Sequence, residues 1–207
     1  MTEAYLRELG QAESLMWAAD RISPLNFVLA SRIIGDLSFD AVRSGVNSLL
    51  RRYPVLAFSI EQKAGGNPKM VKTDRPLSID CLTGNSWVEH AVRDLNRPFH
   101  CPLEPLVRVR WLRGDTGAYL LLTLHHAIAD GRAGVDVLAT LIQYIHQAME
   151  GQTTSVEPLP PGLPMEKRVL SQTSNKNHPV SARGQRFNDA QDGADQRRTL
   201  IFPHCFD

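Results

Sequence analysis

The chain has 207 residues, of which 43% are hydrophobic and 22% charged, and its formal net charge is +1. This length suits one domain, and a folded region of about 150 residues typically buries roughly 68–70% of its unfolded surface, enough for a core without disulfides or metals. The balanced charge gives no electrostatic reason to expect binding to nucleic acid or to an anionic membrane surface.

Cysteine usage and the N-terminal sequence favour a cytoplasmic protein. The three cysteines, Cys81, Cys101 and Cys205, are widely spaced and form no CxxC pair. This pattern argues against a disulfide framework or a zinc ribbon and favours a reducing compartment. We expect no signal peptide, because no basic-then-apolar run opens the chain, and no apolar stretch is long enough for a membrane span.

The first predicted elements alternate between strand and helix. Residues 26–34 are rich in strand-forming side chains and predict a strand. Ser38 is a candidate N-cap for a helix that Pro54 ends. Residues 55–62 predict a second strand, and residues 69–72 are expected to pair back on it after a glycine-rich turn.

The second half of the pattern is helix, hairpin, helix. Ser86 opens a predicted capping box and a short helix. Residues 106–112 and 118–124 predict an antiparallel hairpin, whose second strand is apolar on both faces and is therefore expected to be central. Arg108 and Arg110 share one face of the first hairpin strand, where we expect them to be solvated.

The chain divides by composition near residue 165. A helix with apolar side chains at helical spacing follows the hairpin and ends near Gly151, and residues 152–165 are then rich in threonine and proline. Residues 1–165 are predicted to form one α/β lobe, a two-layer sandwich of a mixed, mostly antiparallel sheet with helices on one face. Residues 166–207 are polar and aperiodic and predict a linker or disordered tail.

Two adjacent histidines close the central strand, in the run His125-His126-Ala127-Ile128-Ala129-Asp130-Gly131. Successive side chains of a strand point to opposite faces, so the two imidazoles diverge and cannot readily share a metal ion. One histidine can therefore face a cavity while the other is structural. The alternative is that both are hydrogen-bonded histidines at the end of a core strand.

This run resembles the HHxxxDG motif of the chloramphenicol acetyltransferase-like superfamily. That group includes the condensation domains of nonribosomal peptide synthesis, the BAHD acyltransferases and polyketide-associated acyltransferases such as phthiocerol dimycocerosyl transferase. Gln11-Ala12-Glu13-Ser14-Leu15-Met16-Trp17 and Leu49-Leu50-Arg51-Arg52-Tyr53-Pro54-Val55-Leu56-Ala57 agree with the family in order and spacing. The resemblance covers roughly residues 5–165.

The resemblance implies an acyltransferase in which His126 projects from the strand end into a cleft and acts as general base. The donor would be an acyl-CoA or acyl-carrier-protein thioester, and the acceptor a hydroxyl or amine. His125 would be structural, Asp130 would hold the loop by pairing with an arginine and could also cap the next helix, and Gly131 would permit a tight turn. The resemblance implies no permanently bound cofactor and no metal.

The length departs from the family, whose members have two similar lobes with a substrate channel between them. The chain resembles the first lobe only, which leaves three alternatives: a truncated enzyme, a polypeptide that needs a second lobe or a carrier protein as partner, or a non-catalytic half-domain. An isolated lobe is expected to expose apolar surface. A hydrolase that uses the same histidine is a further alternative, disfavoured because no GxSxG nucleophile motif is present.

Overall fold

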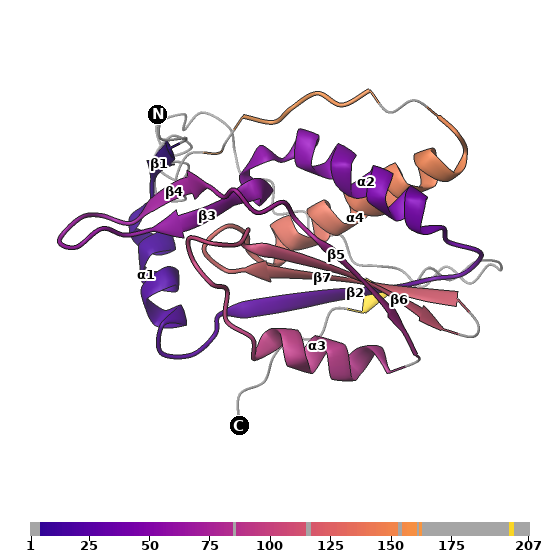
Figure 1. The fold of residues 1–207 in the computed structure, drawn as a ribbon, viewed down its shortest axis with the longest axis horizontal. Coiled ribbons are helices and arrows are strands. Elements are labelled where there is room, and N and C mark those ends of the chain that lie inside the picture. The colour runs from indigo at the N-terminus through magenta and orange to yellow at the C-terminus, as the bar shows by residue number, and fades with distance from the viewer. Residues whose placement is uncertain are drawn as a thin grey trace, which may run out of the picture.

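The computed structural model describes residues 5–84, 86–114, 117–152, 155–160, 162 and 199–200. Its centre is a five-stranded sheet with the strand order β5-β6-β7-β2-β8 (Figure 1). The strands span Asn26–Ile33 (β2), Ile79–Thr83 (β5), Val107–Gly114 (β6), Gly117–His125 (β7) and Thr199–Leu200 (β8). Only the β5–β6 pair is parallel, so the sheet is mixed and mostly antiparallel, as predicted.

Strand β7 is the central strand, and its side chains divide the core in two. Every residue from Leu120 to His125 is buried. Leu120, Leu122 and Leu124 belong to the main core beneath two helices, whereas Leu121 belongs to a smaller cluster on the opposite face. The period of two therefore sends alternate side chains into two different layers, and the prediction of a central strand is confirmed.

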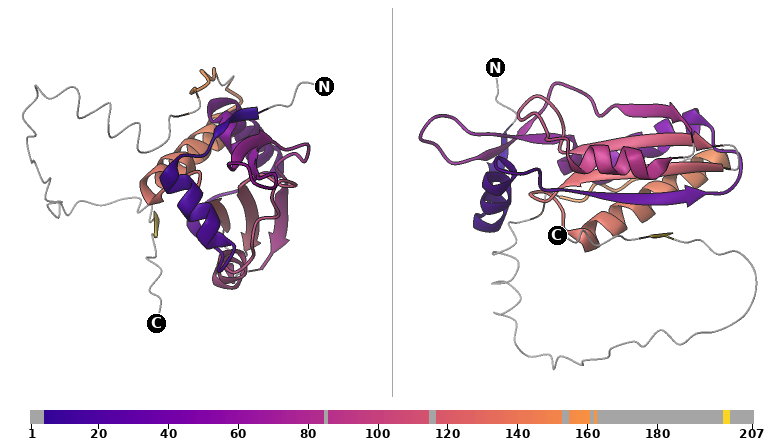
Figure 2. Two further views of the ribbon diagram at one scale, coloured as in Figure 1. Left: turned by 90° about the vertical axis from the view of Figure 1, so that its left-hand side faces the viewer. Right: turned by 90° about the horizontal axis from the view of Figure 1, so that it is seen from below.

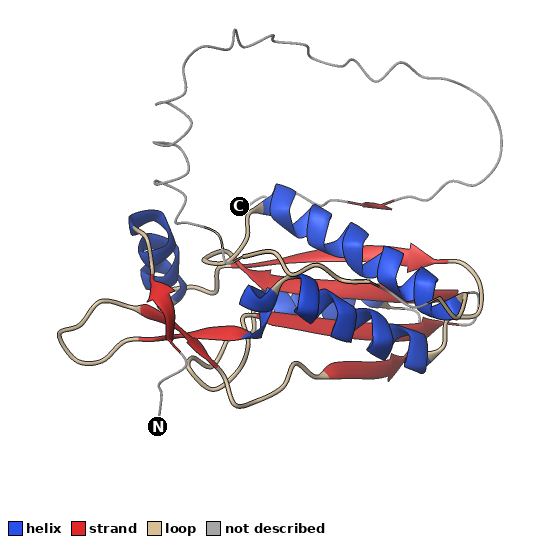
Figure 3. Ribbon diagram, turned by 90° about the horizontal axis from the view of Figure 1, so that it is seen from above, coloured by secondary structure: helices blue, strands red, loops and turns tan. Residues whose placement is uncertain are grey.

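Helices cover both faces of this sheet. Helix α2 (Phe39–Arg52) and helix α4 (Gly131–Met149) pack side by side on one face, and helix α3 (Trp87–Leu95) lies against the other (Figures 1 and 3). The predicted α/β class is confirmed, but the expectation of helices on one face is wrong. The sequence of β7 explains the difference, because a strand that is apolar on both sides must be covered on both sides.

Local sequence explains how α2 begins and how closely it packs. The Ser38 hydroxyl accepts a hydrogen bond from the Ala41 amide at 3.2 Å and caps the helix, as predicted. Gly45 lets α2 approach α4, since a Cβ there would stand 2.5 Å from Cγ1 of Ile145. Ser86 precedes α3 but makes no side-chain capping bond, so the predicted capping box is wrong.

A second, three-stranded sheet lies at one end of the first. It has the order β1-β4-β3, with strands Tyr5–Glu8 (β1), Phe58–Glu61 (β3) and Lys69–Lys72 (β4). The predicted pairing of 69–72 with the strand before it is confirmed. That strand is shorter than expected, because Pro54–Ala57 form a 3-10 turn (η1), a geometry that proline favours at a helical first position.

Helix α1 (Gln11–Asp20) stands beside this end of the molecule and buries none of its residues (Figure 2). Leu15 and Met16 on α1, and Ile22 just after it, are exposed apolar side chains. The predicted tail, 166–207, lies outside the described residues except for β8, which pairs with Ala30 and Ser31 of β2. No helix in the described part of the chain is long and apolar enough to cross a bilayer.

Candidate active site

The two histidines lie where β7 ends, between β2 and β6. His125 is the last residue of β7, and residues 126–128 form a turn. Two other segments hold this turn through its backbone: His125 N–H donates to the Leu106 carbonyl at 3.1 Å, and His126 N–H to the Leu25 carbonyl at 3.0 Å. Within the turn, Ile128 N–H donates to the His125 carbonyl at 3.1 Å. The backbone that carries His126 is therefore fixed by neighbours from separate segments.

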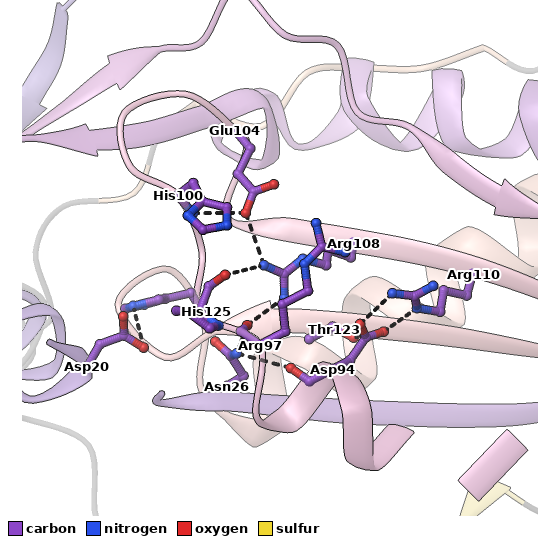
Figure 4. Close-up of polar contacts among 11 residues, drawn as sticks. Asp20, Asn26, Asp94, Arg97, His100, Glu104, Arg108, Arg110, Thr123 and His125 are labelled. Carbon is purple, nitrogen blue, oxygen red and sulfur yellow. Dashed lines mark hydrogen bonds and ion pairs between the residues drawn. The ribbon is translucent and has the colours of Figure 1, made fainter. Parts of the chain in front are cut away.

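The imidazole of His125 is fully buried. Its Nδ1 accepts a hydrogen bond from the Ala127 amide at 2.9 Å, and its Nε2 lies 3.4 Å from Oδ1 of Asp20 (Figure 4). The ring of Phe99 packs against it in an edge-on arrangement, with 6.0 Å between ring centroids. This side chain is part of the interior and has no access to a substrate.

His126 has the opposite environment, because it is exposed. Its imidazole packs against Phe27 of β2, with 4.7 Å between ring centroids, so the ring is partly buried although the residue as a whole is exposed. This partial burial is the main cause that lowers the pKa of His126 below its ordinary value of 6.5, and the nearby His125 acts in the same direction. The Asp130 carboxylate and the Ala129 backbone oppose the shift without cancelling it. His126 is therefore a neutral imidazole near pH 7, the form that accepts a proton.

Asp130 is the N-cap residue of α4. Its Oδ1 accepts a hydrogen bond from the Ala133 amide at 2.7 Å, which joins the histidine turn to the start of the helix. Among the described residues no arginine lies within ion-pair distance of Asp130, so the arginine partner implied by the resemblance is not found there. Gly131 is the first residue of α4, its φ is not positive and a Cβ there would meet no atom within 4 Å, so neither its backbone nor its described neighbours require a glycine; its role in the turn stays a prediction.

The glycine that the local packing requires is Gly134, one turn into α4. A Cβ at this position would stand 2.5 Å from Cε2 of Phe27 and 3.0 Å from Cδ1 of Leu29. Gly134 thus leaves room for the same phenylalanine ring that supports His126. Neither Gly134 nor Phe27 was singled out from the sequence, since a glycine within a helical pattern and a phenylalanine in a strand have ordinary structural explanations.

Arg108 and Arg110 are buried, which corrects the expectation that they are solvated. Nε and Nη2 of Arg110 donate to the two carboxylate oxygens of Asp94 at 2.6 and 2.7 Å, and Asp94 itself has no exposed surface (Figure 4). Arg108 donates to Glu104 at 3.0 Å and to the carbonyls of Arg97 and Pro98. Helix α3 covers the face that they occupy. The prediction of helices on one face of the sheet left this cover out.

The main surface hollows of the described structure lie away from His126. Three surface hollows of about 670, 370 and 210 Å³ are lined by other residues, around β4, the β6–β7 turn and β5. The cleft expected around His126 is not found among them. Within the described residues, no three His, Cys, Asp or Glu side chains are grouped closely enough to hold a metal ion.

The condensation domain family matches residues 22–163, more than half of the chain. The chain therefore belongs to the condensation-domain family. It is 28% identical to phosphinothricin tripeptide synthetase PhsC of Streptomyces viridochromogenes over 167 residues, which are 73% of this chain and 15% of that protein. It is also 28% identical to phthiocerol/phthiodiolone dimycocerosyl transferase of Mycobacterium tuberculosis over 149 residues, 71% of this chain and 35% of that one.

Solved structures give the same fold. Polyketide synthase associated protein 5 from Mycobacterium tuberculosis aligns with a TM-score of 0.65 and 24% identity, covering 84% of this chain and 41% of the other. The starter condensation domain of rhizomide synthetase aligns with a TM-score of 0.65 and 15% identity, covering 81% and 45%. The superfamily expected from the histidine motif is confirmed. The chain spans less than half the length of these relatives.

Proposed function

We propose that the chain is an acyltransferase lobe, which moves an acyl group from a thioester to a hydroxyl or amine with His126 as general base. The observation that supports this most is the contrast between the two histidines. His125 is buried and hydrogen-bonded, whereas His126 is exposed on a backbone that is hydrogen-bonded to two other segments. A base must reach the proton that it removes, and of these two histidines the exposed one, His126, fits that requirement.

The chemistry follows from an imidazole that is neutral at pH 7. His126 takes the proton of the acceptor as its oxygen or nitrogen attacks the carbonyl carbon of the thioester. The carbon–sulfur bond then breaks, and the leaving thiolate takes the proton back from the imidazolium. A general base contributes about 10²–10⁴-fold, so the positioning of both substrates must supply much of the remaining acceleration.

The donor we propose is an acyl-CoA or a carrier-protein thioester, used as a co-substrate and not held as a permanent cofactor. Membership of the condensation-domain family supports a thioester donor, and the sparse cysteines favour a reducing cytoplasm. The relatives' names concern a peptide synthetase and a dimycocerosyl transferase, which are different acyl chemistries. We therefore propose the reaction class without a particular acyl chain or acceptor.

The alternative is a non-catalytic half-domain that binds a second lobe. Two observations favour it: the chain spans less than half of its relatives, and α1 and the residues after it expose Leu15, Met16 and Ile22. Exposed apolar side chains that lie close together in the sequence are what a second lobe could cover. In this alternative His126 would be present without a substrate to act on.

The test is a transfer assay on the full 207-residue chain. Acyl-CoA and acyl-carrier-protein thioesters are offered with alcohols and amines, and both free thiol and acylated product are measured. His126→Ala should lose about 100-fold or more of the transfer, while the matched control His146→Ala, an exposed histidine on α4, should keep it. Full transfer by His126→Ala refutes the catalytic role. No transfer by the unmodified chain favours the half-domain alternative.

A further inference from the structure

One carboxylate, that of Asp20, is linked to both histidines by separate routes. Asp20 is the last residue of α1, and its side chain is 10% exposed. Its Oδ1 accepts a hydrogen bond from the Leu25 amide at 2.6 Å, and the Leu25 carbonyl in turn accepts the His126 amide at 3.0 Å. This first route runs from Asp20 through one residue of the α1–β2 connection to the backbone of His126.

The second route runs through the side chain of His125. Because Nδ1 of His125 accepts the Ala127 amide, it carries no proton, and the ring proton must be on Nε2. That nitrogen is buried, and within the described residues it has no well-aligned hydrogen-bond partner. The carboxylate of Asp20, 3.4 Å away, is the group that faces it (Figure 4).

We propose that Asp20 is a positioning residue for His126. Its carboxylate holds His125 as the Nε2–H tautomer, so that Nδ1 fastens the Ala127 amide after His126, while Leu25 fastens the amide of His126 itself. The turn is thus tied on both sides of the exposed imidazole by a residue 106 positions away in the sequence. The catalytic meaning of this role rests on the function proposed above, but the geometric role does not.

The electrostatic surroundings agree with a charged Asp20. Burial acts to raise the pKa of this carboxyl group, but the nearby His125 side chain and the hydrogen bond from the Leu25 amide outweigh it and lower the pKa below 3.8. The charge of Arg108 on β6 also lowers the pKa of Asp20. The charge of Asp20 in turn acts to raise the pKa of the Cys101 thiol. Asp20 is therefore ionised throughout the neutral range.

The experiment is nuclear magnetic resonance on the full chain with ¹⁵N-labelled histidine and backbone. In the unmodified protein, the ring nitrogens of His125 should report the Nε2–H tautomer, and the Ala127 amide should be protected from exchange with solvent. Asp20→Asn keeps the size of the side chain but removes its charge. It should mix the tautomers of His125, speed exchange of the Ala127 amide by about tenfold and shift the titration midpoint of His126.

The matched control is Asp36→Asn, an exposed aspartate on the loop before α2, which should change none of the three signals. A merely structural role for Asp20 would lower the melting temperature and leave the titration of His126 unchanged, and that result overturns the proposal. If Asp20→Asn does not fold, the unmodified protein still decides, because an Nδ1–H tautomer of His125 contradicts the proposed arrangement.

These signals need no substrate, so the two proposals fail separately. Altered histidine signals in Asp20→Asn, together with full transfer by His126→Ala, would leave the positioning role intact and remove the general base. Unaltered signals, together with loss of transfer in His126→Ala, would do the reverse.

Discussion

Two glycines near the start of α4 should respond in opposite ways to replacement by alanine. At Gly134 a Cβ would stand 2.5 Å from Phe27 and 3.0 Å from Leu29, closer than side chains normally pack, whereas at Gly131 it would meet nothing within 4 Å. Alanine gains about 1 kcal/mol over glycine inside a helix, and overpacking costs about 1–3 kcal/mol. We therefore expect Gly134→Ala to lose about 0–2 kcal/mol and Gly131→Ala to gain about 0.4–1 kcal/mol.

Urea unfolding measures this difference directly. With a slope of about 1–3 kcal/mol per molar urea, a 1 kcal/mol change moves the midpoint by roughly 0.3–1 M. Gly134→Ala should also move the ring of Phe27 and so change the ¹H shifts of the His126 imidazole, which Gly131→Ala should leave in place. A Gly134→Ala protein that is at least as stable as Gly131→Ala, with the His126 signals unmoved, would refute the argument that Gly134 makes room for Phe27.

Three further predictions use paired or internal comparisons. Ser38→Ala should destabilise the protein by about 0.5–2 kcal/mol because this hydroxyl caps α2, while Ser86→Ala should change little because that hydroxyl caps nothing. Arg110→Ala should cost about 3–5 kcal/mol, since it leaves a buried carboxylate without its partner, whereas Arg43→Ala removes an exposed pair and should cost at most about 1 kcal/mol. The titration midpoint of His126, followed by nuclear magnetic resonance, should lie below 6.5.

The lowered pKa of His126 makes the stability of the fold depend on pH. Because folding lowers the pKa of His126, the unfolded chain takes up its proton first on acidification. The contribution of this group is therefore complete above pH 6.5 and is lost as the pH falls through the lower, folded value. A titration midpoint of His126 above 6.5 would contradict the effect of its partial burial. Equal unfolding midpoints for the two serine variants would contradict the cap at Ser38, and equal losses for the two arginine variants would contradict the buried pair of Arg110 with Asp94.

The sequence predicted the parts of the fold that depend on local pattern. The strand over 26–34, the hairpin of 106–112 and 118–124, and the helix capped by Ser38 follow from periodicity and capping, which act over a few residues. The second helical layer was missed because it depends on where α3 packs, and the burial of Arg110 was missed with it. A strand with alternating arginines has the same pattern whether water or a buried Asp94 faces it.

The sequence also predicted only part of the candidate site. The motif predicted His126 as the base and His125 as structural, and the structure places the first in solvent and the second in the interior. Asp20 could not be found from the sequence, because a lone aspartate at a helix end has many uses and its contact with His125 spans 105 positions. Contacts between distant positions form only when the whole fold assembles, so the local sequence pattern around either residue does not predict them.

The open side of His126 has a chemical consequence for any thioester brought to it. A base in contact with bulk solvent deprotonates water as well as an alcohol or an amine, and the acyl group would then end as a free acid. Selective transfer therefore requires a wall over this imidazole, whereas among the described residues His126 stays exposed. The ratio of acid to acylated product in the assay would measure how completely such a wall, from whatever source, closes over the ring.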